Sequence, residues 1–105
     1  MKKLFITQKK ALPVSSILFL ESDSNYTHIF TSDQKEFIAS KTLNTIYNDL
    51  DQNEFYRINR SLVIHKDYIK TKEQQANALY FTLNNGQKVK VARRRKKSIM
   101  MRLNA

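Results

Sequence analysis

Residues 55–69 read FYRINRSLVIHKDYI, in which a polar break interrupts apolar sequence. The apolar segments 55–58 and 62–64 flank the polar residues 59–61. Loops run over the surface, so a polar break between buried segments presents its side chains to solvent. We therefore expect Arg60 to stand at an exposed loop tip.

Outward from this stretch, most of the chain alternates apolar and polar residues with a period of two, which is typical of strands. A polar turn over residues 21–25 is rich in side chains that bond their own backbone. The pattern predicts an antiparallel meander with strands at residues 4–6, 17–20, 26–31 and 35–39, and a single helical turn within 13–16.

The clearest hairpin joins strands at 78–83 and 88–91. Its turn contains Asn85 and Gly86, the only glycine of the chain, and this pair is expected to supply the positive φ angles of the turn. Lys88 and Lys90 should project from one face of the returning strand.

Two segments have a helical period. Residues 42–50 predict a helix capped by Ser40 or Thr42. Residues 93–103 predict a terminal helix, in which Arg93, Arg94 and Lys97 point away from the apolar side. The apolar faces consist of Leu43, Ile46, Tyr47 and Leu50 in the first helix, and of Ala92, Ile99 and Leu103 in the second.

Positive charge is concentrated at the C-terminal end. Residues 74–105 contain eight Lys and Arg residues and no Asp or Glu, whereas the preceding part has 11 basic and 9 acidic residues. Five of the eight form an unbroken run at 93–97. Such a surface suits a polyanion, and nucleic acid is the first candidate because phosphate neutralisation releases counterions. A solvated basic tail that only aids solubility is the alternative.

Length and composition narrow the class of protein. The 105 residues predict a single domain, 1–105, with a modest core. Cysteine is absent, which excludes disulfides and cysteine-type zinc sites. No apolar run approaches the roughly 20 residues that span a bilayer. We expect a cytoplasmic protein without membrane partners.

Several motifs resemble the LytTR family of DNA-binding domains. Residues 17–22 and 25–29 are similar to the family's I-x-Y-I-E-A and N-Y-V-x-I motifs, and residues 55–69 resemble its F-x-R-I-H-R-S-Y-I-V-N-L-x-x-I signature. Residues 83–94 are similar to L-x-D-G-x-x-x-P-V-S-R-x. The resemblance extends over about residues 4–103.

The resemblance implies a mainly β fold, an elongated stack of small antiparallel β-sheets with short helices. It also implies that loops, and not a recognition helix, enter the major groove of DNA. Base-reading positions of the family correspond here to Asn25, Thr27, His28, Arg60 and Arg93.

Side-chain chemistry supports the arginines independently. A guanidinium can bond guanine O6 and N7 together, a contact worth about 1–3 kcal/mol of base discrimination. Alternatively, Arg60 forms a salt bridge with Asp67 or Glu54, or Arg93 is simply solvated. Expected phosphate contacts, which position a domain without reading bases, are Lys41, Ser61, Lys66, Arg94, Lys96 and Lys97.

The sequence departs from the family pattern at three positions. Asn59 replaces the usual His and keeps a hydrogen-bonding side chain, so the turn should survive. His65 replaces an Asn, which can mimic a backbone turn in ways not expected of an imidazole. Ala92 replaces a Ser and loses a hydroxyl that could contact phosphate.

Together these features predict sequence-specific binding of double-stranded promoter DNA by a bacterial transcription regulator, with dimerisation on tandem half-sites. An RNA-binding module that stacks bases on Tyr26 or Tyr80, and a protein-interaction module, are the alternatives. No catalytic residues, cofactors or metal site are expected; His28, His65 and Asp67 would need a proximity that nothing in the spacing ensures.

LytTR domains are often the output half of two-component response regulators. Only about 15 residues precede the family-like core, too few for a receiver domain. The chain is thus expected to be a free-standing regulator or a fragment of a longer one.

Overall fold

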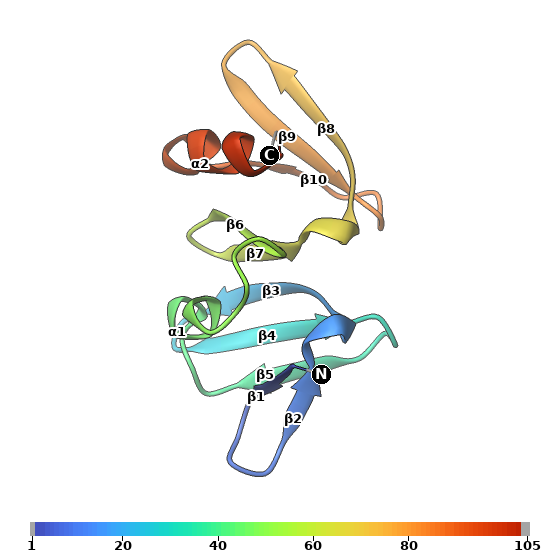
Figure 1. The fold of residues 1–105 in the computed structure, drawn as a ribbon, viewed down its shortest axis with the longest axis vertical. Helices are drawn as coiled ribbons and strands as arrows, with labels where there is room; N and C mark the ends of the chain where they lie inside the picture. The colour runs from blue at the N-terminus through green and yellow to red at the C-terminus, as the bar shows by residue number, and fades with distance from the viewer. Residues whose placement is uncertain (1, 104–105) are drawn as a thin grey trace.

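The computed structural model describes residues 2–103, which form three antiparallel sheets stacked along one axis (Figure 1). The principal extents are 46 × 24 × 24 Å, so the domain is elongated. This arrangement confirms the mainly β stack expected from the sequence. Within residues 2–103, no helix combines the length and apolar character needed to cross a membrane.

The N-terminal layer is a two-stranded sheet of β1 (Lys3–Phe5) and β2 (Ala11–Pro13). The 3-10 turn η1 (Val14–Ser16) follows, where the sequence predicts a helical turn. It leads into the central sheet.

The central sheet has five strands in the order β5-β4-β3-β7-β6. β3 therefore lies in the middle, and the chain crosses from one edge, β5, to the other, β6, through helix α1. The order confirms the antiparallel meander for β3, β4 and β5, whereas the predicted strand at residues 4–6 belongs to the separate β1–β2 sheet. β7 pairs with the free side of β3. The bounds are β3 Ile17–Asp23, β4 Tyr26–Thr31, β5 Glu36–Ala39, α1 Leu43–Asn48, β6 Phe55–Asn59 and β7 Leu62–His65.

The C-terminal layer follows the 3-10 turn η2 (Lys66–Tyr68). Strands β8 (Ile69–Gln75), β9 (Ala78–Leu83) and β10 (Lys88–Lys90) form its sheet, in the order β10-β9-β8. Helix α2 (Arg93–Leu103) then lies between this sheet and the central sheet in Figure 1. The bounds of α2 confirm the predicted terminal helix.

Two apolar cores hold the stack together. One cluster fills the space between the N-terminal layer, α1 and the central sheet, with Leu20, Ile29 and Phe55 fully buried. The other joins the central sheet to the C-terminal layer and includes Ile58, Phe81 and Ile99. The central sheet is buried on both faces, which matches the continuous apolar run at 17–20.

Local signals explain most element ends. Thr42 caps α1, since its Oγ1 accepts a hydrogen bond from the Thr45 N–H at 3.2 Å. In the C-terminal hairpin only Gly86 has a positive φ, 90°, and Asn85 instead accepts from the Gln87 N–H. The expectation of positive φ at both Asn85 and Gly86 was therefore wrong. The loop between β9 and β10 is longer than a two-residue turn and needs only one left-handed residue.

Candidate nucleic-acid interface

Three turns meet at one edge of the central sheet. The turns are the β3–β4 turn, the β6–β7 turn and the entry to α2, all on the left of Figure 1. Main-chain hydrogen bonds join them: the Ser22 N–H donates to the Ser61 carbonyl at 2.9 Å, and the Ala92 N–H donates to the Ile58 carbonyl at 2.6 Å. We call this region, with Asn25, Lys41, Arg60, Ser61 and Arg93, the loop edge.

The β6–β7 turn is built by side chains on both sides of Arg60. Asn59 Oδ1 accepts from the Ser61 N–H at 2.8 Å, so the Asn that replaces the usual His still closes the turn. Arg57 donates from Nη2 to the Arg60 carbonyl at 3.0 Å and from Nε to the Asn59 carbonyl at 3.3 Å. Its Nη1 donates to Asn44 Oδ1 of α1 at 2.8 Å. Arg57 thus fixes the turn to the helix.

Arg60 itself is exposed at the tip of this turn. Within residues 2–103 it forms no ion pair with either suggested partner: Glu54 instead lies 3.4 Å from His65 Nε2 and 3.6 Å from Lys66 Nζ, and Asp67 has no contact with Arg60. The salt-bridge alternative for Arg60 is therefore wrong. Its guanidinium is available for an external acceptor.

Cations also gather where α2 begins. Arg93, Arg94 and Lys97 are exposed, as the helical period predicts, and none of them forms an ion pair within the described residues. Because the Ala92–Ile58 hydrogen bond fixes the helix entry beside β6, Arg93 and Arg60 belong to the same edge.

The β3–β4 turn supplies the third part of the edge. Ser24 has φ 54°, and Asn25 is exposed at the tip. β3 runs on to Asp23, so the turn is shorter than the polar segment 21–25 suggests.

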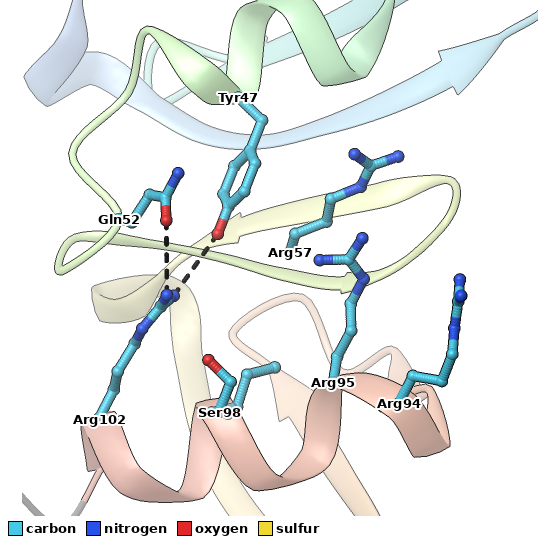
Figure 2. A pocket seen from close by; sticks show the side chains of 8 residues that line it. Tyr47, Gln52, Arg57, Arg94, Arg95, Ser98 and Arg102 are labelled. Atoms are coloured by element: carbon cyan, nitrogen blue, oxygen red, sulfur yellow. Dashed lines mark hydrogen bonds between the residues drawn. The ribbon is translucent and has the colours of Figure 1, made fainter.

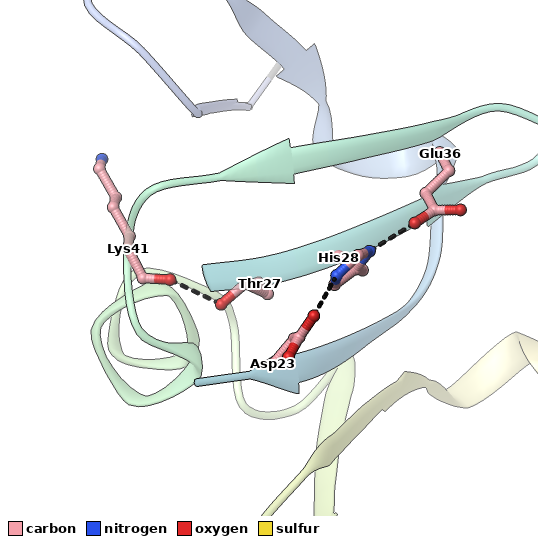
Figure 3. A network of polar contacts seen from close by, with 5 residues as sticks. All are labelled: Asp23, Thr27, His28, Glu36 and Lys41. Atoms are coloured by element: carbon pink, nitrogen blue, oxygen red, sulfur yellow. Dashed lines mark hydrogen bonds and ion pairs between the residues drawn. The ribbon is translucent and has the colours of Figure 1, made fainter. Parts of the chain in front are cut away.

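Thr27 does not reach the surface. Its side chain is fully buried, and its hydroxyl donates to the Lys41 carbonyl at 2.7 Å (Figure 3). The expectation that Thr27 reads a base is corrected here: it lies on the Ile29 side of β4, toward the core.

His28 lies on the other face of β4, between two carboxylates (Figure 3). Its Nδ1 contacts Glu36, and its Nε2 lies 3.1 Å from Asp23. The hydrogen bonds that the imidazole donates to Glu36 and, second, to Asp23 raise the pKa of His28 above 6.5. Since both ring nitrogens are occupied, His28 is corrected from a base reader to a residue that holds the two carboxylates.

Three expected phosphate contacts have partners or positions that weaken the expectation. Lys41 Nζ donates to the Phe5 carbonyl at 3.0 Å, and Lys96 Nζ donates to the Asn77 carbonyl at 2.6 Å. Lys66 follows the C-terminal end of β7, whereas Arg60 precedes the N-terminal end of this strand. The Nζ atom of Lys66 lies 3.6 Å from Glu54. A phosphate would have to replace these contacts, so the phosphate role of the three lysines stays a prediction; of the three, Lys41 lies at the loop edge.

His65 performs a turn role that was not expected of an imidazole. Its Nδ1 accepts from the Asp67 N–H at 3.0 Å and caps η2. The replacement of the family's Asn at this position is thus compatible with the turn. No group of three or more metal-ligating side chains occurs within residues 2–103.

Comparison with known proteins shows the family of this domain. A family model described as the LytTr DNA-binding domain matches residues 8–104. The chain belongs to the LytTR family. LytTR domains are DNA-binding domains of transcriptional regulators, and the exposed Arg60 and Arg93 of this LytTR domain lie on the loop edge.

A solved structure has the same fold. It is the LytTr DNA-binding domain of a Bacillus cereus protein described as a methyl-accepting/DNA response regulator, with a TM-score of 0.76 and 20% sequence identity. The alignment covers 99% of this chain and 96% of that chain. A search of curated protein sequences found no match to this LytTR domain.

One residue at this interface was missed by sequence reasoning. Arg57 is half-buried and holds the Arg60 turn through the contacts described above. The available signal was a lone cation within a strand of apolar residues, where a charged side chain needs partners.

Proposed function

We propose that this LytTR domain reads repeated half-sites in promoter DNA by inserting the turns of the loop edge into the major groove. The observation that carries the proposal is the joining of the Arg60 turn and the Arg93 helix entry at one edge. Arginine is the side chain that most often makes specific base contacts, because its fork matches guanine O6 and N7.

Base reading is assigned to three exposed side chains, Asn25, Arg60 and Arg93. The main-chain bonds at Ser22 and Ala92 hold them on a common frame, so little ordering is needed when DNA binds. The domain is 46 Å long, which exceeds one helical repeat of DNA, about 34 Å. Contacts along the stack can thus reach a groove and its flanking backbone together.

Phosphate contacts are assigned to Lys41, Ser61, Arg94 and Lys97. These groups lie at or beside the loop edge and position the domain without reading sequence. Lys41 must exchange its bond to the Phe5 carbonyl for a phosphate oxygen, so its contribution is the smallest of the four. Two domains bound side by side would read tandem half-sites.

The competing RNA-binding function relies on aromatic stacking. Tyr26 is half-exposed, at 50%, and adjoins the Asn25 turn. Tyr80 is less suited, because the Lys88 ammonium lies 4.9 Å from its ring centroid. Tyr26 alone keeps this alternative testable.

A selection on random duplexes, followed by fluorescence anisotropy, tests the proposal. If about six phosphates are neutralised, log affinity should fall with log salt at a slope near −5. The selected duplex should also outcompete single-stranded RNA of the same sequence. Preference for the RNA would favour the stacking function, and no retention of duplex at low salt would favour a protein-interaction module.

A further inference from the structure

A pocket of about 340 Å³ lies between α1 and α2, beside the loop edge. Arg57 of β6 borders it on one side, and Arg94, Arg95 and Arg102 border it from α2 (Figure 2). In Figure 2, Arg95 extends from α2 toward Arg57, while Arg102 lies at one side of this pair and Arg94 at the other. Guanidinium groups from two separate elements thus line the pocket.

Among the described residues 2–103, no carboxylate lines this pocket. Within residues 2–103, none of the four arginines forms an ion pair. Burial lowers the pKa of Arg57, and the positive charges of Arg95 and Arg60 lower it further. Positive charge has therefore been gathered here without a counter-charge from the described part of the chain.

In the part of the chain that the structure describes, the arginines of the pocket contact only neutral groups, and some of their guanidinium N–H donors remain without a hydrogen-bond acceptor. Arg102 contacts the Tyr47 hydroxyl and Gln52 Oε1, both at 3.5 Å, which is the long limit of a hydrogen bond. A guanidinium has five N–H donors in a planar fork that matches the oxygens of a phosphate. The Ser98 side chain, also at the pocket, adds a hydroxyl.

We infer that this arginine pocket binds a phosphate group. The group comes from one of two sources: a free phosphorylated small molecule, or a backbone phosphate of the bound duplex. Only the second source rests on the proposed function. An occupant would also contact Arg57, which holds the Arg60 turn, so pocket and turn are linked through one side chain.

The first experiment needs no DNA. Pyrophosphate is titrated into the ¹⁵N-labelled domain at constant ionic strength. We expect saturable shifts at the amides of Gln52 and Ser98, and at least a tenfold loss of affinity in Arg95→Gln and Arg102→Gln. Lys72→Gln, which removes one exposed positive charge from β8, should bind within twofold of the unchanged domain.

Dispersed amide spectra of all three variants establish that they fold. Shifts that do not saturate, or equal losses in all three variants, would overturn the inference, because they indicate diffuse charge only. This readout is independent of duplex binding, so it can succeed where the proposed function fails.

A second experiment identifies the source. Pyrophosphate is added at constant ionic strength to the domain bound to its selected duplex. Competitive weakening of the complex assigns the pocket to a backbone phosphate. An unchanged duplex affinity, with the pocket occupied by the criterion above, assigns it to a free phosphorylated molecule.

Discussion

The main-chain N–H of Ala92 donates a hydrogen bond of 2.6 Å to the carbonyl oxygen of Ile58. This bond connects the residue that precedes α2 to strand β6, which leads into the Arg60 turn. Arg60 and Arg93, which are more than 30 positions apart in sequence, therefore lie at the same edge of the domain. Binding residues often lie on loops that a rigid scaffold holds in place.

Replacing Arg57 should loosen the turn that presents Arg60. Arg57→Gln removes hydrogen bonds to the carbonyls of Asn59 and Arg60 and to Asn44. Hydrogen bonds from charged groups are worth about 1.5–3 kcal/mol, so we expect a loss of about 2 kcal/mol in the free energy of unfolding by urea. Arg60→Ala, at an exposed position, should change stability by less than about 0.5 kcal/mol. Equal stability of the two variants would contradict a bracing role for Arg57.

Thr27→Val should affect stability and not base preference. The substitution leaves the partly buried carbonyl of Lys41 without its hydrogen bond from the Thr27 hydroxyl, at a cost of about 1–3 kcal/mol. Chemical denaturation measures the cost, and a repeated duplex selection measures the preference. A changed consensus in the folded variant would return Thr27 to the base-reading set.

Docking of α2 should depend on Ile99. Ile99 is 2% exposed, whereas Met101 of the same helix is 67% exposed. Ile99→Ala should cost about 2–5 kcal/mol of stability, and Met101→Ala should cost little. Because α2 carries Arg93, we also expect the Ile99 variant to bind duplex more weakly. A neutral Ile99→Ala in thermal unfolding would show that the helix is not packed as described.

The His28 site should make stability depend on pH. Hydrogen bonds that His28 donates to Glu36 and Asp23 raise its pKa in the folded state above the unfolded value of 6.5. The stabilising contribution is therefore complete below about pH 6.5 and disappears as pH rises through the raised folded pKa. Imidazole NMR should show a midpoint above 6.5, and Glu36→Gln should lower it. A midpoint at 6.5 or below in the unchanged domain would refute the raised value.

The sequence predicts the local elements better than their arrangement. Period-two alternation and turn residues locate β4 and β9 with the observed bounds, since each signal is contained within a few neighbouring residues. The pairing of β7 with β3 could not be predicted from neighbouring residues. Both segments are apolar on both faces, so their sequences do not indicate which strand each one pairs with. The resemblance to the family compensates for part of this.

At the interface, too, local features were predicted better than contacts between distant segments. Arg60 and Arg93 were predicted to be exposed, since a polar break and a helical period identify exposed positions. Thr27 was misplaced, although the strand period assigns it to the face of buried Ile29, because the prediction relied on the correspondence with the family's base-reading positions. The partners of Lys96 and Arg57 lie in distant segments and could not be inferred from spacing.

Base reading by Arg60 is tested most directly by the ratio of affinities for the selected duplex and a shuffled duplex. Arg60→Ala should lower this ratio by a factor corresponding to about 1–3 kcal/mol. Lys97→Ala should weaken both complexes equally and leave the ratio unchanged, since a phosphate contact carries no sequence information. An Arg60→Ala domain that folds and keeps the full ratio would contradict sequence reading through the loop edge.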